Sequence, residues 1–329
     1  MKPTIAVLST GGTIAGKADS STDKSYTSAK LDVKGLLLAV PPLEQLADIE
    51  ARQIANVGSQ DMQDNIWLEL AARINALLQR DSIEGIVVIH GTDTIEETAY
   101  FLNLVISSDK PVVLTAAMRP STALSADGPL NIYNAVAVAA DSDARGRGVL
   151  VVVNDDIHGA RGMTKTSTTD VQTFVSAERG LVGASLYGKN RYYRSPYRTH
   201  TSASEFRTQG ISELPKVQII YMHAGVSAEL IEAAVASHAQ GIVTAGVGNG
   251  NMSAATLSAV KKAIGEGVVV VRSTRVTNGT VDRNIEINDD DLGTVASGEL
   301  NPAQSRVLLK LALLKTRNVE HVQRLFDRY

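Results

Sequence analysis

The sequence contains no cysteine and few aromatic residues, which make up 4% of its 329 residues. The absence of cysteine excludes a disulfide framework, a thiolate metal site and a cysteine nucleophile. An excess of one charge is also missing, since 32 Lys and Arg residues against 35 Asp and Glu residues leave a net charge of −3. We therefore expect no nucleic-acid partner, because general nucleic-acid-binding proteins are usually strongly basic.

Long apolar runs are missing as well. The longest ones, such as Val149–Val153, have the length of a strand and not the ~18 residues that a membrane span needs. The first four residues lead straight into a strand-like run and do not form a signal peptide. We therefore expect no membrane association, and a periplasmic location if a leader has been removed or a cytoplasmic one otherwise.

Short β-branched runs alternate with longer helical patterns along most of the chain. Most runs are apolar throughout, as in strands that helices cover on both faces. The pattern predicts an α/β fold, in which a larger N-terminal domain has a mainly parallel sheet flanked by helices and a smaller C-terminal domain is also α/β. The predicted strands are Ile5–Leu8, Ile86–Ile89, Val112–Leu114, Val149–Val153, Val217–Tyr221, Ile242–Ala245 and Val268–Val271, and the predicted helices are Met62–Gln79, Ile95–Ile106, Leu130–Ala140 and Ala303–Leu314.

The alternation breaks between Gly188 and Pro215, where polar and basic residues dominate. This stretch has no visible core period and is interpreted as a linker or an irregular arm. Tyrosines and arginines alternate in its first part, which favours a solvated arm or an interface. At about 150 residues per domain, the length fits two domains. We expect an N-terminal domain over residues 1–190, a linker over 191–215 and a C-terminal domain over 216–329.

The first candidate site is Thr10-Gly11-Gly12-Thr13, directly after the first predicted strand. In open α/β sheets, ligands bind at the carboxyl ends of the strands. The two glycines let the backbone and its N–H groups approach a ligand closely, and Thr13 adds a hydroxyl group. This combination suits a nucleophile beside an oxyanion hole, although a plain glycine turn has the same pattern.

A second motif, from His90 to Thr94, also follows a strand and precedes a helix. Asp93 is either a ligand-binding carboxylate or a helix N-cap. Thr94 and Glu97 match a capping box, which would leave Asp93 available for binding. His90 could be a triad base, but at the end of a buried strand we expect a structural histidine.

Two polar segments each have two possible interpretations, one functional and one structural. Ser59 and Gln60 precede a predicted helix, where they could bind a carboxylate or where Ser59 could be a cap. Lys165 lies among threonines and could relay a proton if burial lowered its pKa, or it could be an ordinary surface lysine.

Two segments of the C-terminal half resemble ligand motifs only weakly. Gly246 to Asn251 lacks the dinucleotide spacing, and Arg272 after the next strand would fit only an NADP variant. The acidic run Asp289 to Asp291 lacks the spacing of an EF-hand, and we expect a solvated loop there.

In their order along the chain, these motifs resemble those of the bacterial L-asparaginases, especially the type II asparaginases and glutaminase-asparaginases. The resemblance extends from Thr10 to the final residues and is highly specific because the motifs occur jointly. The matching segments are TGGTIAG from Thr10, GSQDM from Gly58, HGTDTIEETAYFL from His90, AMRPSTALSADGP from Ala117, TKTSTTD from Thr164, GVGNGN from Gly246 and LNPAQSRVLL from Leu300.

The resemblance implies catalytic roles for several residues. Thr13 would be the nucleophile on the side-chain amide carbon, and Tyr26 would be its activating partner on a mobile lid. Thr92, Lys165 and Asp93 would form a second Thr-Lys-Asp set. The backbone at Gly12 and Thr92 would stabilise the oxyanion.

The same resemblance implies a clamp for a zwitterionic substrate. Ser59 and Gln60 would hold the α-carboxylate, and Asp93 would bind the α-ammonium group. A neighbouring subunit would supply Glu286, a catalytic acid that also binds the α-ammonium group. Asn251 would reach the site from the same subunit, with Asn249 a less favoured choice. Ala117 would be a further substrate contact.

The expected function is an amidohydrolase that converts L-asparagine to L-aspartate and ammonia, and also L-glutamine to L-glutamate, through a threonine acyl-enzyme. No metal or organic cofactor is expected. The expected assembly is a homotetramer built from intimate dimers. A non-catalytic, periplasmic-type amino-acid-binding protein with the same clamp is the alternative, and an NADP-dependent oxidoreductase is a distant third.

Overall fold

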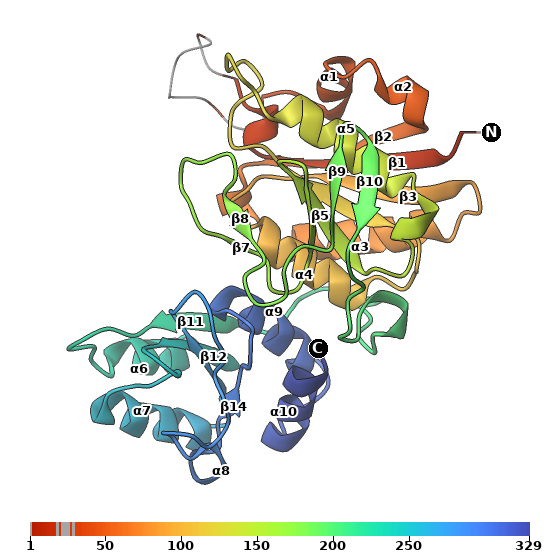
Figure 1. Ribbon diagram of the computed structural model, residues 1–329. Helices are drawn as coiled ribbons and strands as arrows, with labels where there is room; N and C mark the ends of the chain where they lie inside the picture. The colour runs from red at the N-terminus through yellow and green to blue at the C-terminus, as the bar shows by residue number, and fades with distance from the viewer. Residues whose placement is uncertain (1, 18–19, 21–26, 28–29) are drawn as a thin grey trace. The chain divides into compact units, whose positions relative to one another are not determined.

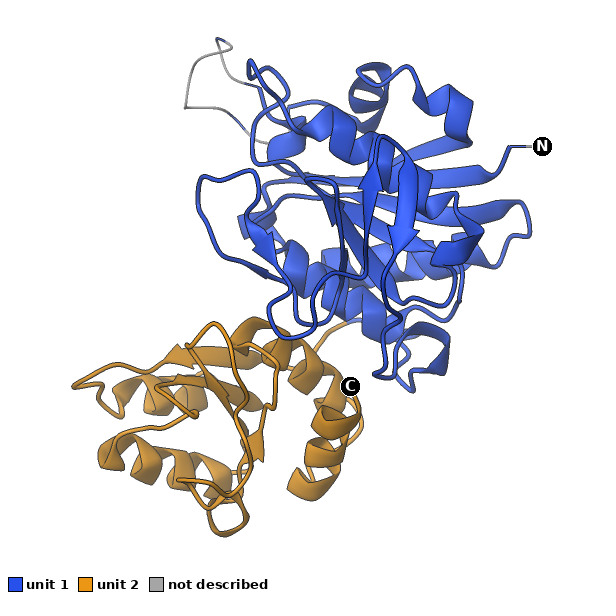
Figure 2. Cartoon of the chain, in the orientation of Figure 1, with its two compact units in different colours: residues 1–212 blue, residues 213–329 orange. Residues whose placement is uncertain are grey.

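A computed structural model describes residues 2–17, 20, 27 and 30–329 of the chain. The chain divides into two compact units, Met1–Ser212 and Glu213–Tyr329 (Figure 2). Strands alternate with helices in both units, and the first unit holds the larger sheet. The predicted fold class is therefore confirmed.

An eight-stranded sheet forms the centre of the first unit (Figure 1), with the order β10-β9-β6-β5-β4-β3-β1-β2. The five strands from β5 to β2 run parallel, whereas β6, β9 and β10 pair in antiparallel fashion. The strands are β1 (Thr4–Gly11), β2 (Asp48–Val57), β3 (Ile83–Ile89), β4 (Val112–Thr115), β5 (Val149–Val153), β6 (Asp156–Gly159), β9 (Gly183–Leu186) and β10 (Lys189–Tyr192), and a separate hairpin joins β7 (Thr164–Lys165) to β8 (Phe174–Val175).

Helices cover both faces of this sheet. Alternate residues of the buried strands face opposite sides, so that Ile5 and Val7 of β1 join one apolar cluster with α1, α2 and α5. Helices α3 and α4 pack against strands of the sheet from the other side, and Trp67 stacks on Phe101 where these two helices meet. The helices are α1 (Val33–Leu38), α2 (Leu43–Leu46), α3 (Asp64–Leu78), α4 (Ile95–Val105) and α5 (Gly128–Ala139).

The strand order places a topological switch between β1 and β3. From β1 the chain crosses to β2 on one side, and from β3 it continues to β4 on the other side. The connections that leave the carboxyl ends of β1 and β3 therefore diverge, and ligands of open α/β sheets bind in the crevice at such a point. The motifs at Thr10–Thr13 and His90–Thr94 lie at this edge of the sheet.

The second unit has a four-stranded parallel sheet with the order β11-β12-β13-β14. Helices α6 and α7 share an apolar cluster with the strands, and α9 contacts β11, β12 and β13. The elements are β11 (Val217–Tyr221), α6 (Glu229–Ala236), β12 (Gly241–Gly246), α7 (Ala254–Gly265), β13 (Val269–Thr274), α8 (Asp289–Leu292), β14 (Val295–Ala296), α9 (Pro302–Leu313) and α10 (Val319–Arg328).

All seven predicted strands and all four predicted helices are present, within a few residues of the expected bounds. Asn301 caps α9 by accepting from the N–H of Gln304. The apolar pattern of the sequence does not predict β2, because this edge strand is half-exposed and mixes charged with apolar residues. The stretch from Gly188 to Pro215 is not irregular throughout, because β10 extends the sheet there with alternately exposed side chains.

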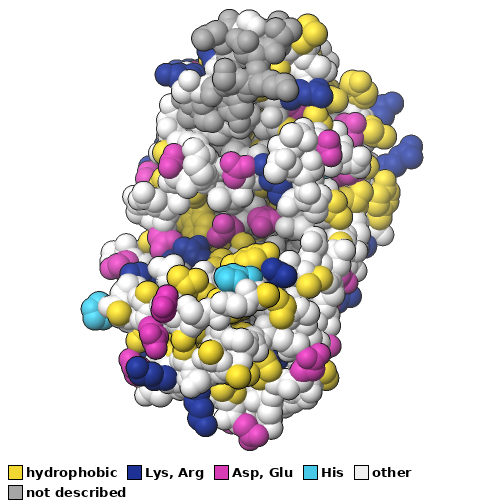
Figure 3. Space-filling model, turned by 90° about the vertical axis from the view of Figure 1, so that its left-hand side faces the viewer, with side chains coloured by type: hydrophobic (Ala, Val, Ile, Leu, Met, Phe, Trp, Pro, Cys, Tyr) yellow, Lys and Arg dark blue, Asp and Glu magenta, His cyan; other side chains and the backbone are white. Residues whose placement is uncertain are grey.

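The surface carries no field of a single charge on the face shown in Figure 3, where basic and acidic side chains are interspersed. This distribution agrees with the nearly balanced composition. Within the part of the chain that the structure describes, no helix is long and apolar enough to cross a membrane.

Gly85, near the start of β3, gives a test of how tightly α5 packs on the sheet. This residue pairs with Ile5 of β1, and a Cβ atom on it would lie 2.3 Å from the backbone oxygen of Ala139. We expect Gly85→Ala to lower the free energy of unfolding by about 3 kcal/mol, because overpacking here displaces backbone. Urea denaturation measures the loss.

Gly265→Ala is the matched control, since a Cβ atom at this helical position meets open space. Alanine is also the better helix former, so we expect a change within about 1 kcal/mol, in the stabilising direction. Equal losses in the two variants would contradict the packing argument.

Candidate active site

The glycine turns after β1 and β3 touch each other. A Cβ atom on Gly12 would lie 2.5 Å from the Cα atom of Gly91, and the φ angle of Gly12 is +89°. Both features require glycine at position 12. A Cβ atom on Gly91 would in turn lie 2.7 Å from the hydroxyl oxygen of Ser59. The three motifs that are separate in the sequence therefore meet at the switch point.

Thr13 follows this contact as the first residue of a short 3-10 helix, Thr13–Ala15, and is half-buried. The hydroxyl-bearing residue thus lies at the carboxyl edge of β1, beside the Gly12–Gly91 contact. The backbone N–H of Gly12, however, donates to the carbonyl of Val57 at 2.9 Å. This bond uses the N–H group within the sheet edge, and the role of Gly12 as an oxyanion donor stays a prediction.

Ser59 is buried and connects its own turn to the turn after β3. Its hydroxyl oxygen accepts from the backbone N–H of Asp93 at 3.1 Å, and its carbonyl accepts from the hydroxyl of Thr94 at 2.8 Å. Thr94 precedes α4 but makes no side-chain cap bond. The predicted capping box is therefore wrong, because the Thr94 hydroxyl is used to join the two turns.

Thr92, Asp93 and Lys165 lie together. The ammonium group of Lys165 donates to the hydroxyl oxygen of Thr92 at 2.9 Å and forms an ion pair with Asp93 at 2.6 Å. The side chain of Asp93 is 57% exposed and that of Lys165 is 20% exposed, so the carboxylate remains accessible. Lys165 belongs to β7, and its backbone N–H donates to the carboxylate of Glu96 at 3.1 Å.

The other site residues predicted in the first unit lie in different surroundings. Ala117 is buried just after β4, at the same edge of the sheet. The exposed Gln60 bonds to Asp61 at 3.3 Å, and its side chain covers Gly58. Tyr26 lies outside the described residues.

In the second unit, Asn251 and Glu286 lie in contact. The amide group of Asn251 donates to the carboxylate of Glu286. The amide oxygen of Asn251 is buried and has no hydrogen-bond partner among the described residues. Asn249 has a different place, because its amide oxygen accepts from the backbone N–H of Asp282 at 3.1 Å. The geometry thus pairs Glu286 with Asn251 and not with Asn249.

Beneath these loops lies an ion pair that is almost completely excluded from solvent. Arg272 makes two bonds of 2.6 Å to Asp289, and the two side chains are 1% and 0% exposed. Burial by itself would raise the pKa of Asp289, but hydrogen bonds from Arg272 and Thr294 outweigh it and lower the pKa. The solvated loop expected at Asp289 is therefore wrong, and Arg272 is not placed to bind a nucleotide phosphate.

His90 is fully buried behind the site and belongs to a chain of hydrogen bonds. Its Nδ1 atom lies 2.8 Å from the carbonyl oxygen of Gly91, which can only accept, so Nδ1 carries the proton. Its Nε2 atom then accepts from the Thr98 hydroxyl at 2.9 Å, and that hydroxyl oxygen accepts from the Trp67 indole at 2.8 Å. The expectation of a structural histidine is confirmed.

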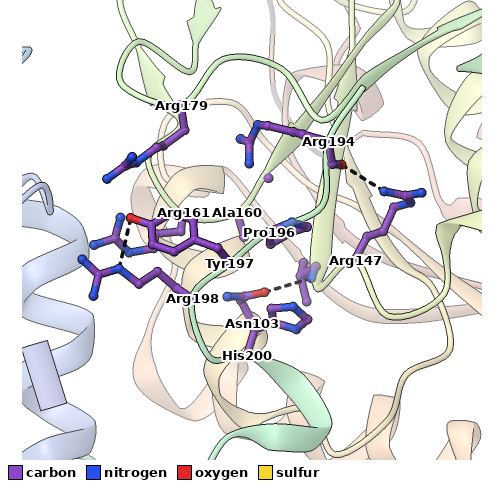
Figure 4. A pocket seen from close by; sticks show the side chains of 12 residues that line it. Asn103, Arg147, Ala160, Arg161, Arg179, Arg194, Pro196, Tyr197, Arg198 and His200 are labelled. Atoms are coloured by element: carbon purple, nitrogen blue, oxygen red, sulfur yellow. Dashed lines mark hydrogen bonds between the residues drawn. The ribbon is translucent and has the colours of Figure 1, made fainter. Parts of the chain in front are cut away.

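A separate pocket of the first unit is lined by five arginines, of which Arg194 and Arg198 belong to the tyrosine-rich stretch (Figure 4). Arg179 and Arg198 lie over the ring of Tyr197, with their guanidinium carbons 4.8 and 5.2 Å from its centre. The volume of this pocket is about 40 Å³, far below the roughly 300–1,000 Å³ of ordinary ligand sites. This pocket therefore does not compete with the edge of β1 and β3 as a substrate site.

Sequence reasoning missed the contacts that hold the site together. Neither the Thr94–Ser59 bond nor the Arg272–Asp289 pair connects residues with motif spacing. The only available signals were a threonine at a helix start and a basic residue in a buried strand. Among the described residues, no group of His, Asp and Glu side chains has the geometry of a metal site.

Two family models match the chain. The model described as "Asparaginase, N-terminal" matches residues 4–198, and the one described as "Glutaminase/Asparaginase C-terminal domain" matches residues 216–326. The chain is 49% identical to L-asparaginase 2 of Escherichia coli over 327 residues, which cover 99% of the chain and 93% of the relative. It is 50% identical to a probable periplasmic L-asparaginase of Haemophilus influenzae, covering 99% and 93%. It is 43% identical to a glutaminase-asparaginase of Acinetobacter glutaminasificans, covering 100% of both.

The buried histidine predicts how stability depends on pH. Burial lowers the pKa of His90 from 6.5 to about 4, so the unfolded chain binds a proton between these values and the folded chain does not. Stability contributed by neutral His90 is complete above pH 6.5 and is lost as the pH falls towards 4. We expect His90→Gln to reduce the drop in unfolding free energy between pH 7 and 4.5 by about 2–3 kcal/mol.

Urea denaturation at the two pH values measures this difference. His223→Gln is the control, since His223 is exposed and should leave the drop unchanged. An unaltered drop in His90→Gln would contradict the assignment of a neutral, buried imidazole.

Proposed function

The chain belongs to the asparaginase family, and we propose that it hydrolyses L-asparagine and L-glutamine through an acyl-enzyme on Thr13. It is an amidohydrolase, as both its domains and its full-length relatives indicate. One observation carries the assignment to this site. The turn that bears Thr13 packs backbone to backbone on the turn that bears Thr92 and Asp93, at the switch point of the sheet.

The reaction needs an activated hydroxyl, because both an amide and a neutral threonine are unreactive. In the proposed first step, the Thr13 oxygen attacks the side-chain amide carbon, and the carbonyl oxygen becomes an oxyanion near the backbone N–H of Thr92. Tyr26 is the proposed partner that takes up the hydroxyl proton. That proton then passes to the amide nitrogen, which leaves as ammonia, and an ester remains on Thr13.

The second step regenerates the enzyme. Water attacks the ester carbon, its hydroxyl completes the product carboxyl group and its proton returns to the Thr13 oxygen. The Thr92–Lys165–Asp93 set is the proposed proton relay, since the lysine ammonium already donates to the Thr92 hydroxyl. A positioned acid or base of this kind contributes about 10²–10⁴ in rate. None of these steps requires a metal or an organic cofactor.

The substrate clamp is proposed from the charges at the same edge. Ser59 and Gln60 bind the α-carboxylate at the start of the turn, where they add no charge of their own. Ala117 limits the space beside the bound α-carboxylate. The accessible carboxylate of Asp93 exchanges part of its ion pair with Lys165 for the α-ammonium group of the substrate. An analogue without that group would leave the acid unpaired, which gives the site its specificity.

Glu286 and Asn251 are proposed to act in the site of a neighbouring subunit, where Glu286 joins Asp93 on the α-ammonium group of the substrate. The assembly would be a homotetramer built from intimate dimers. The contact between Glu286 and Asn251 supports a shared role, and the buried, unpartnered oxygen of Asn251 is an acceptor that a ligand could satisfy. The domain limits of 1–190 and 216–329, with a linker between them, belong to the same proposal.

The proposed location depends on export. A leader upstream of this sequence would direct the protein to the periplasm, the compartment named for the Haemophilus relative, and otherwise the protein acts in the cytoplasm. The alternative of a non-catalytic amino-acid-binding protein has no observation in its favour, because the relatives are named for the reaction.

The nucleophile can be tested directly. We expect Thr13→Ala to lower kcat for ammonia release from both L-asparagine and L-glutamine by about 10³-fold or more, because the variant cannot form the ester. Thr168→Ala, at an exposed threonine, is the matched control and should stay within about twofold of the parent. Wild-type rates in Thr13→Ala would refute the nucleophile.

Mixed subunits test the shared site. We expect Thr13→Ala and Glu286→Gln to be severely impaired alone, and to recover about one quarter of the parental activity when co-refolded in equal amounts. Half of the dimers are then mixed, and one of their two sites has both native residues. If mixing restored no activity, Thr13 and Glu286 would act within one subunit.

A further inference from the structure

Arg272 uses its guanidinium group to hold three separate segments of the second unit. It projects from β13, and two of its nitrogens bond to Asp289 at the start of α8. A third bond of 3.0 Å reaches the carbonyl of Asn249, and a fourth of 3.2 Å reaches the carbonyl of Asp282. The planar fork of arginine makes such a set of directed bonds possible, and a lysine could not reproduce it.

Asp289 fixes the same loop from the other side. One of its carboxylate oxygens accepts from the Thr294 hydroxyl at 2.5 Å, and the other accepts from the backbone N–H of Asn284 at 3.0 Å. The side chain of Asn284 returns the contact by accepting from the N–H of Asp289 at 2.8 Å. Asn284 has a φ angle of +58°, which is an uncommon conformation that these bonds maintain.

Two of the segments that Arg272 holds, those at Asn249 and at Asp282, carry the residues assigned to the neighbouring subunit's site. Asn251 is two residues after Asn249, and Glu286 is two residues after Asn284. The segments are also tied to each other, since Asn249 accepts from the N–H of Asp282 and Asn251 donates to Glu286. Gly250 lies directly on the guanidinium, where a Cβ atom would be 3.1 Å from Nη1.

We propose that the buried Arg272–Asp289 pair is the positioning element that sets Glu286 and Asn251 for recognition of the substrate's α-ammonium group. The inference rests on the proposed function, in which Glu286 binds that ammonium. A binding carboxylate must be held within about 0.5 Å of its working position, and exposed Glu286 lacks the packing to hold itself. The ion pair supplies that rigidity from below, without touching the ligand.

The test compares two ligands that differ only in the ammonium group. Calorimetry measures the Kd of L-aspartate and of succinate for the full-length assembly. We expect Arg272→Lys to weaken L-aspartate about tenfold and succinate less than about twofold, because only L-aspartate depends on the position of Glu286. Arg317→Lys, at an exposed arginine of the same unit, should change neither Kd.

A double-mutant cycle separates positioning from general damage. In a Glu286→Ala background, Arg272→Lys should weaken L-aspartate no further, because the group that it positions is absent. Asn249→Ala leaves the ion pair intact and removes only the Asn249–Asp282 side-chain tie. It should weaken L-aspartate about threefold with the same ligand selectivity, and it replaces Arg272→Lys if that variant fails to fold.

The outcomes are distinguishable. Equal weakening of both ligands, or a further tenfold loss in the Glu286→Ala background, would overturn the positioning role and leave the clamp intact. An unchanged affinity of Glu286→Ala for L-aspartate would refute the clamp itself, and the positioning role with it.

Discussion

The close approach of two backbone turns is the constraint on which the rest of the site depends. Gly12 and Gly91 leave no room for a side chain between the ends of β1 and β3. Because the strands are neighbours in one parallel sheet, this contact brings the turn of Thr13 against the turn of Thr92 and Asp93. The sheet therefore provides the rigid frame, and the diverging connections provide the space for a ligand.

Much of the fold could be predicted because its signals are local. The strands that helices cover on both faces are continuous apolar runs, and the caps and prolines of helices such as α9 stand next to the residues they affect. The candidate site could be predicted for a related reason. Residues after neighbouring parallel strands meet at one edge, so short motifs such as those at Thr13 and Asp93 indicate their common location.

The contacts that could not be predicted join residues far apart in the sequence. The Thr94 hydroxyl has two possible uses, a helix cap or a bond to Ser59, and only the tertiary arrangement decides between them. Asp289 looks like a member of an exposed acidic run, and its burial depends on an arginine 17 residues earlier. β2 and β10 pair through backbone hydrogen bonds at the edges of the sheet, which place little demand on their side chains.

The hydrogen-bond chain behind the site has a consequence for observing the protein. Trp67 is the only tryptophan in the sequence, and its indole bonds to Thr98, which bonds to His90 next to Gly91. The whole tryptophan emission therefore comes from one buried ring, stacked on Phe101. A ligand that shifts the turn after β3 changes the surroundings of that ring, so the protein carries its own optical reporter of the site.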